Sequence, residues 1–145
     1  MKLQVLNPKS SKKLRPFFPI AIPAGKAQPI EQEPEWIDID HYIRGNQDNT
    51  VYVRATGRSM KSKHEAGIDD GDILAVQRTR CAKPGDVVIA EINGEFTVKR
   101  LRHHTHGLYL VPANDDYPIR KVERSETFSV WAVVSYVIQK MRRAA

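Results

Sequence analysis

Two residues of this chain, Ser59 and Lys99, have the types and surroundings that peptide-bond hydrolysis requires. Ser59 lies just past a strand-like run, in the segment 55–60, and Lys99 lies inside a second strand-like run, 95–101. A serine hydroxyl is a weak nucleophile near neutral pH and needs a neighbouring base, which a lysine provides when its amine is uncharged. The pair therefore predicts a serine nucleophile with a lysine general base.

The base must be an unusual lysine, because free lysine has a pKa of about 10.4. Burial against apolar groups without a carboxylate partner lowers the pKa, since desolvation penalises the ammonium form. Strand alternation places Thr97, Lys99 and Leu101 on one face and Phe96 and Val98 on the other. We expect Lys99 to be half-buried between Thr97 and Leu101; the alternative is a solvated charge on an edge strand.

Size and composition indicate one soluble globular domain with an arm. The chain has 145 residues, 41% of them hydrophobic and 28% charged. No apolar run approaches the length of about 18 residues that a membrane helix needs, so no membrane association is expected. Cys81 is the single cysteine and cannot form an internal disulfide, which is consistent with a reducing compartment.

The sequence predicts that residues 1–35 form a flexible N-terminal arm containing the cleavage site and that residues 36–145 form the folded domain. Proline fixes φ and removes a backbone donor, so no helix or central strand is expected in the arm. Its first 24 residues carry five bases and no acid, whereas the rest of the chain carries 18 bases and 17 acids. A basic arm can contact nucleic acid nonspecifically or an acidic partner; the alternative is a solvated tail. The prolines of the arm are Pro8, Pro16, Pro19, Pro23, Pro29 and Pro34.

The signals from residue 50 onward predict a mostly-β barrel or sandwich, because short strand-like runs alternate with turn signals about every ten residues. Asn93-Gly94 is the strongest hairpin signal, since both central positions of a type I′ turn need positive φ. Asp40 is expected to cap a short helix over 41–44 that stops at Gly45. The expected strands are residues 51–55, 73–77, 87–92, 95–101, 108–111 and 128–138.

The chain resembles the self-cleaving Ser-Lys proteins of the bacterial DNA-damage response, the LexA/UmuD family. The Ser-Met block at 59–60, the Asp-Gly-Asp turn at 70–72 and the Gly-Glu-Phe-Thr-Val-Lys strand at 94–99 form a specific combination in this order. The resemblance implies a LexA/signal-peptidase-like β-barrel or sandwich domain with an extended arm. The other matching stretches are 24–25, 37–40, 55–58, 67–69, 85–90, 110–114 and 130–134.

The resemblance also assigns roles to residues. It implies that Ser59 is the nucleophile and Lys99 the general base, and that the backbone N–H groups of Arg58 and Ser59 form the oxyanion hole. The scissile bond would be Ala24–Gly25, where small residues let the arm lie deep in a narrow cleft. No cofactor and no metal are implied.

By the same resemblance, cleavage is stimulated by the RecA filament on single-stranded DNA in the bacterial cytoplasm. The shortened chain would then act with a UmuC-type Y-family polymerase in error-prone translesion synthesis. The resemblance also implies a homodimer, in which we expect the long apolar C-terminal strand to be a shared surface. Cleavage within one subunit and cleavage across a dimer both remain open.

Two features depart from the family pattern. The loop 61–66, directly after the nucleophile, is a few residues longer, which bears on the local geometry and the cleavage rate. The basic arm is also not a feature of the UmuD-type members of the family, which are subunits of a translesion polymerase.

Three other functions are alternatives to a self-cleaving peptidase. A LexA-type repressor would need a helix-turn-helix domain, for which residues 1–35 show no helical pattern. A secretory signal peptide would explain a basic stretch, an apolar stretch and Ala24-Gly25, but the apolar stretch is short and holds Pro19 and Pro23. A non-catalytic β module would make Ser59 and Lys99 incidental.

Three further groups of residues are better explained as structural. His103, His104 and His106 fall where a turn is expected and lack partner ligands at metal-site spacing. Residues 69–72 resemble a calcium loop but lack the acidic residue at the twelfth position, so we expect a turn. Cys81 has no identifiable histidine partner, and we expect a passive thiol.

Overall fold

The computed structural model of the chain describes residues 2–6, 14–17, 24–25, 27 and 33–141. The chain divides into two compact units, the first made of Met1–Pro8 and Gln47–Ala145 and the second of Lys9–Asn46. This grouping places residues 36–46 in the second unit, whereas the sequence analysis divided the chain between residues 35 and 36. In the described part of the chain no helix is long and apolar enough to cross a membrane.

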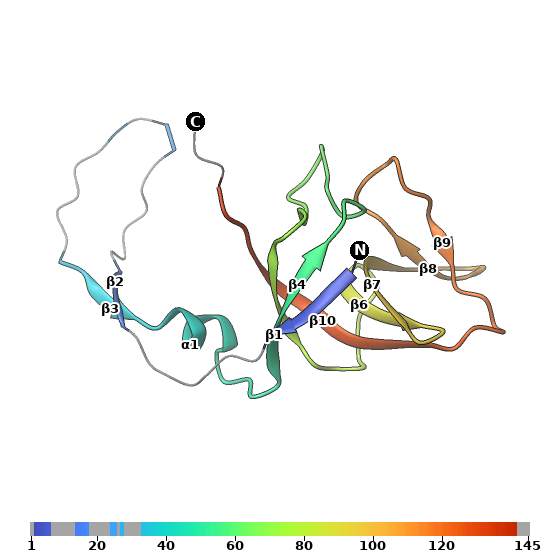
Figure 1. The fold of residues 1–145 in the computed structure, drawn as a ribbon, viewed down its shortest axis with the longest axis horizontal. Coiled ribbons are helices and arrows are strands. Elements are labelled where there is room, and N and C mark those ends of the chain that lie inside the picture. Colours follow the sequence, from blue (N-terminus) through green and yellow to red (C-terminus); the bar gives the residue numbers. More distant parts are fainter. Residues whose placement is uncertain (1, 7–13, 18–23, 26, 28–32, 142–145) are drawn as a thin grey trace. The chain divides into compact units, whose positions relative to one another are not determined.

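The first unit is built on one antiparallel sheet of eight strands, and the predicted mostly-β fold is confirmed (Figure 1). The hydrogen-bonded order is β1-β4-β5-β10-β6-β7-β8-β9. The strands are β1 (Lys2–Leu6), β4 (Thr50–Thr56), β5 (Ile73–Gln77), β6 (Val87–Ile92), β7 (Glu95–His104), β8 (Gly107–Val111), β9 (Arg120–Lys121) and β10 (Phe128–Ile138).

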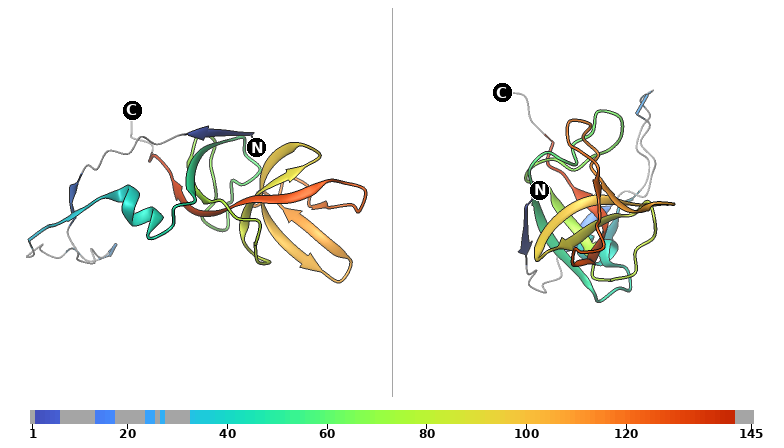
Figure 2. Two further views of the ribbon diagram at one scale, coloured as in Figure 1. Left: turned by 90° about the horizontal axis from the view of Figure 1, so that it is seen from below. Right: turned by 90° about the vertical axis from the view of Figure 1, so that its right-hand side faces the viewer.

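The sheet curls so that distant strands meet. Strand β1 lies next to β7, although β4, β5, β10 and β6 separate the two in the hydrogen-bonded order. Two further views show how strongly the strands twist and coil around one another (Figure 2). This curl brings the end of β4 towards β7, the two strands from which Ser59 and Lys99 were predicted to come.

Two groups of buried apolar side chains hold the sheet together. One of them includes Met60, which is 2% exposed, so the residue after Ser59 is fixed in the core. The first group consists of Val53, Ala55, Met60, Ile68, Leu74, Val76, Ile89, Val98 and Ala132. The second consists of Val88, Ala90, Ile92, Leu101, Leu110 and Val130.

Strand β10 is the long central strand of the sheet. Its first half pairs with β6 and its second half with β5, and the register shifts between Val130 and Ala132 and between Val134 and Tyr136. Such bulges bend a strand and increase its twist, which lets one strand serve two neighbours in a curled sheet. The predicted hairpin is also confirmed, because β6 and β7 meet at Asn93 and Gly94, with φ of 50° and 82°.

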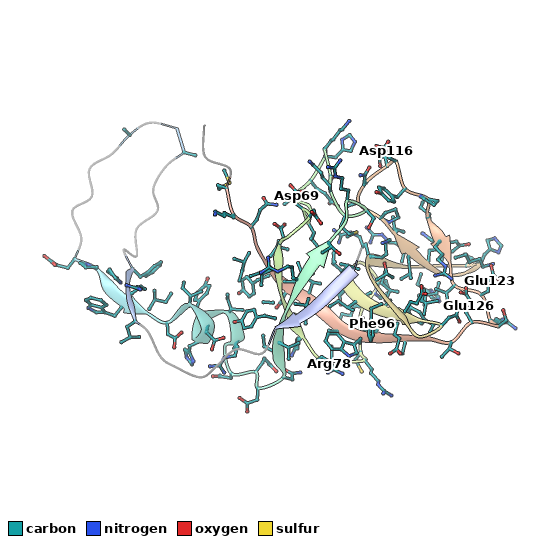
Figure 3. All side chains as sticks on the ribbon, in the orientation of Figure 1. Asp69, Arg78, Phe96, Asp116, Glu123 and Glu126 are labelled. Atoms are coloured by element: carbon teal, nitrogen blue, oxygen red, sulfur yellow. The ribbon has the colours of Figure 1, made fainter. Side chains whose placement is uncertain are left out.

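An aromatic cluster covers part of this sheet away from the end of β4. The Arg78 guanidinium lies 4.0 Å from the centre of the Trp131 ring, and its Nε donates to the Trp131 carbonyl. The Phe96 ring meets Trp131 edge-on at 5.8 Å. Figure 3 shows Arg78 and Phe96 together at one end of the unit, with Asp69 and Asp116 towards the other.

The second unit contains a two-stranded ribbon and a short helix. Strand β2 (Arg15–Phe17) pairs with β3 (Glu35–Ile37), and α1 spans Ile39–Arg44. The predicted cap of this helix is wrong: the Asp38 carboxylate accepts from the His41 N–H at 3.3 Å, whereas Asp40 pairs with Arg44 one turn later. The predicted stop at Gly45 is confirmed, with φ of 57°.

Strands β1 and β2 lie in the segment that the sequence analysis left without regular structure. Residues 2–6 precede the first proline, Pro8, so every backbone N–H in β1 is available for the pairing with β4. Pro16 is tolerated in β2 because each strand of a two-stranded ribbon is an edge strand. Proline is excluded from central strands, whereas β1 and β2 both lie at the edge of a sheet.

Candidate active site

Ser59 lies in a tight loop at the C-terminal end of β4. The loop begins at Gly57, whose φ of 97° is a conformation that favours glycine. The Gly57 N–H donates to the Asp70 carboxylate at 2.8 Å, and Lys61 N–H donates to the Arg58 carbonyl at 3.1 Å. These bonds fix the loop on both sides of Ser59, a residue that is only 3% exposed.

Lys99 reaches this loop from β7, where it pairs in register with Val88 of β6. Its Nζ lies 3.0 Å from Ser59 Oγ, so the structure brings the two predicted residues into hydrogen-bond contact. The same Nζ lies 2.9 Å from Thr97 Oγ1 and 3.0 Å from the Val98 carbonyl oxygen. The curl of the sheet is what makes this contact between β4 and β7.

Burial lowers the pKa of Lys99, because the charged ammonium loses solvation in this half-buried position. In the described part of the chain no carboxylate forms an ion pair with Lys99. The environment therefore shifts Lys99 towards the uncharged amine that the sequence analysis required of a general base.

The uncharged amine can satisfy all three contacts. A neutral amine has two N–H donors and one lone pair, and Thr97 Oγ1 and the Val98 carbonyl are acceptors for the two donors. The lone pair is then left for the third neighbour, the Ser59 hydroxyl at 3.0 Å. In this state the hydroxyl donates to the amine, which is the arrangement needed for proton transfer from oxygen to nitrogen.

The backbone N–H groups of Arg58 and Ser59 are open. Among the described residues no acceptor binds either of them. Unoccupied N–H groups beside a nucleophile can stabilise a developing oxyanion.

Sequence reasoning gave no role to two residues that contact the site. Thr97 was placed on the face of Lys99, but strand alternation does not reveal a hydrogen bond between them. Asn114 lies in the loop between β8 and β9, and its backbone N–H donates to the Ser59 carbonyl at 3.0 Å. Its side-chain amide donates to the Arg58 carbonyl at 2.9 Å. The only sequence signal for Asn114 was its place at the end of a matching stretch, 110–114.

The long loop 61–66 is tied to its surroundings by its own polar side chains. Ser62 Oγ accepts from the N–H groups of His64 and Glu65 at 3.0 and 3.1 Å. His64 Nε2 lies 3.1 Å from the Asp115 carboxylate, and Glu65 lies 3.4 Å from the Arg100 guanidinium. Arg100 is the residue after Lys99, so the loop is joined to the strand that carries the lysine.

Ala24 and Gly25, the predicted cleavage point, belong to the second unit. Both residues are exposed, and no described atom lies within 4 Å of where a Cβ on Gly25 would be. A peptide bond in an exposed, uncrowded segment is accessible to a protease site.

The other candidate residues are the histidines at the end of β7, the 69–72 turn and Cys81. His103 and His104 end β7, and within the described ranges no three His, Cys, Asp or Glu side chains are grouped as metal ligands. In the 69–72 turn the buried Asp72 carboxylate accepts from the Asp69 N–H at 2.8 Å and from Gln139 at 3.0 Å. Cys81 is an exposed free thiol.

Comparison with known proteins agrees with this geometry. Residues 16–135 match the Peptidase S24-like family. Protein ImpA of Salmonella typhimurium and of Escherichia coli is 36% identical over 130 residues, which cover 89% of this chain and 86% of ImpA. The LexA repressor of Delftia acidovorans is 46% identical over 78 residues, or 54% of this chain and 34% of the repressor.

Ser59 and Lys99 lie in contact on a mostly-β domain, and the family model that this domain matches is that of a peptidase. The chain belongs to the Peptidase S24-like family and is a LexA/UmuD-type member of it. It spans about a third of the length of the LexA repressor that it matches and most of the length of ImpA.

Proposed function

We propose that this chain is a serine peptidase that cuts its own Ala24–Gly25 bond with Ser59 and Lys99. The single observation that carries the proposal is the 3.0 Å contact between Ser59 Oγ and an Nζ whose pKa is lowered by burial. A serine alone, or a solvated lysine near it, would not support the reaction.

The proposed reaction proceeds in two halves. Lys99 accepts the hydroxyl proton as Ser59 Oγ attacks the Ala24 carbonyl carbon, and the N–H groups of Arg58 and Ser59 bind the oxyanion. Lys99 then returns the proton to the Gly25 nitrogen as the peptide bond breaks, leaving residues 1–24 as an ester on Ser59. Water, deprotonated by Lys99, hydrolyses the ester and restores Ser59.

The arm is proposed to be a tethered substrate. Attack on a segment of the same molecule replaces substrate affinity by effective concentration, so the rate depends on how often the arm places Ala24 beside Ser59. A RecA filament on single-stranded DNA would act by favouring the arm conformation that can be cut, without supplying a chemical group. The protein would then act in the SOS response in the bacterial cytoplasm.

The shortened chain is proposed to act as an accessory subunit of a UmuC-type Y-family polymerase in translesion synthesis, as a homodimer. The end of β10 supports a shared surface, because Tyr136, Val137 and Ile138 are 42%, 41% and 43% exposed, whereas residues 128–134 of the strand are buried or half-buried. Exposed apolar residues in a row are typical of contact surfaces between proteins. The basic arm of the intact form would in addition contact DNA nonspecifically.

The test is incubation of the purified full chain at alkaline pH without any trigger protein. Raising the pH neutralises Lys99, so mass spectrometry is expected to show loss of residues 1–24, and Ser59→Ala and Lys99→Ala are both expected to block it. Lys61→Ala is the matched control, because Lys61 is close to Ser59 in sequence but 53% exposed and paired with Asp69. Unchanged cleavage in Ser59→Ala would instead favour a non-catalytic β module.

A further inference from the structure

Asn114 binds the backbone of the loop that carries Ser59, although the two residues follow strands that lie far apart in the sheet. It follows β8, whereas Ser59 follows β4. Its N–H donates to the Ser59 carbonyl at 3.0 Å, and its Nδ2 donates to the Arg58 carbonyl at 2.9 Å. One residue therefore binds two successive carbonyl groups in the loop that carries the nucleophile.

The orientation of the Asn114 amide is fixed by a second bond. Its Oδ1 accepts from the Asp116 N–H at 3.0 Å, and a backbone N–H can only donate. The nitrogen end of the amide must therefore face the Arg58 carbonyl, which can only accept. Figure 3 shows Asp116 in this loop, at the end of the unit away from Arg78 and Phe96.

Holding the Arg58 carbonyl also holds the Ser59 N–H. The two groups belong to one planar trans peptide unit, in which the C=O and N–H bonds point in opposite directions. Lys61 N–H binds the same carbonyl at 3.1 Å, so the two donors together stop the peptide plane from turning. The Ser59 N–H is left pointing away from both donors, and it is one of the two open N–H groups of the site.

We propose that Asn114 is a positioning residue for the oxyanion hole: its side chain sets the direction of the Ser59 N–H and does not touch the reacting atoms. This inference rests on the proposed self-cleavage by Ser59. It predicts that loss of the Asn114 donor slows the step in which negative charge develops on oxygen, while the nucleophile itself stays intact.

The first measurement is the rate of trigger-free self-cleavage in Asn114→Ala and Asn114→Asp. The Asp variant keeps an oxygen for the Asp116 N–H but loses the donor to Arg58. Both are expected to be roughly 10- to 100-fold slower, less than the about 10²–10³ lost when an oxyanion donor itself is removed. The Ala variant is expected to keep the pH midpoint of the parent, since Lys99 remains buried. Asp116→Asn, in the same exposed loop, is the control and is expected to cleave at the parental rate.

The second measurement separates the oxyanion hole from the nucleophile. In a Ser59→Cys, Cys81→Ser background, alkylation of Cys at position 59 by iodoacetamide displaces iodide from a saturated carbon and forms no oxyanion. Asn114→Ala is expected to leave this rate unchanged.

An alkylation rate that falls together with cleavage would overturn the inference, because Asn114 would then act on the nucleophile or on folding. Parental cleavage in Asn114→Asp would overturn it as well, because the turn alone would be enough. If Ser59→Ala still cleaves, the proposed function itself is wrong. If Ser59→Ala does not cleave but the Asn114 variants cleave at the parental rate, only the inference about Asn114 is wrong.

Discussion

Replacing Thr97 by Val is expected to make self-cleavage faster at neutral pH. Thr97 Oγ1 lies 2.9 Å from Lys99 Nζ and accepts a hydrogen bond from the amine in either protonation state. A hydrogen bond to a charged group is worth about 1.5–3 kcal/mol and one between neutral groups about 0.5–1.5 kcal/mol. Removing the acceptor therefore disfavours the ammonium by about 1–1.5 kcal/mol more than the amine.

That free-energy difference sets the change in the fraction of molecules with an uncharged Lys99. Below the midpoint of the pH profile, 1–1.5 kcal/mol raises the fraction of uncharged Lys99 by about 5- to 12-fold. The site is partly open to water, and solvent screening favours the lower figure. Because the rate follows the uncharged fraction, cleavage at neutral pH is expected to rise by the same factor, while the plateau at alkaline pH stays near that of the parent.

The assay is the loss of intact chain over time, followed by gel or mass spectrometry from neutral to alkaline pH. Thr97→Ser is the matched control, because it keeps the oxygen and is expected to retain the parental profile. A Val profile that moves to higher pH, or that coincides with the Ser profile, would refute the assignment of this oxygen as a partner of the ammonium form.

Three further predictions concern stability and binding. Gly67→Ala is expected to lower the free energy of unfolding by about 1–3 kcal/mol in urea, because its Cβ would lie 2.5 Å from the Met60 oxygen and 2.7 Å from the Ser62 nitrogen; an unchanged midpoint would contradict the packing described for this loop. In a Ser59→Ala background, Lys99→Met is expected to raise stability at neutral pH. Burial lowers the pKa of Lys99 in the folded chain, so this gain should disappear as the pH rises from the folded-state pKa through the ordinary lysine value; a pH-independent gain would argue against a desolvated amine. The intact chain is expected to bind DNA with a salt slope steeper by as much as roughly 4 units than residues 25–145, and equal slopes would exclude DNA contact by the arm.

The local elements of the fold were predictable because they depend on neighbouring residues. The Asn93-Gly94 turn and the run 128–138 carry their own signals, positive φ at the turn and sustained apolar and β-branched residues in the strand. Strands 73–77 and 87–92 were predicted with the observed bounds for the same reason. Strand β9, with only Arg120 and Lys121, has no such signal and depends on its pairing with β8.

The site was only partly predictable. Ser59 and Lys99 were named from residue types and from a family resemblance, but their 3.0 Å contact depends on a curl of the sheet that brings β4 and β7 together across three intervening strands. The clamp by Asn114 depends on the same long-range packing, since 54 or more residues separate it from the carbonyls that it binds. No local pattern encodes such a contact. The helix cap was missed because Asp38 and Asp40 are both acceptable caps by residue type.

The most direct test of the account is the protonation state of Lys99 itself. In the Ser59→Ala chain, which should not cleave itself, an NMR titration of the lysine Cε and Hε resonances measures the pKa of each lysine, with Lys99→Ala used to assign the signal. We predict that Lys99 loses its proton at lower pH than every other lysine of the chain. A Lys99 that titrates together with the exposed lysines would contradict the proposal that an uncharged amine takes the proton of Ser59.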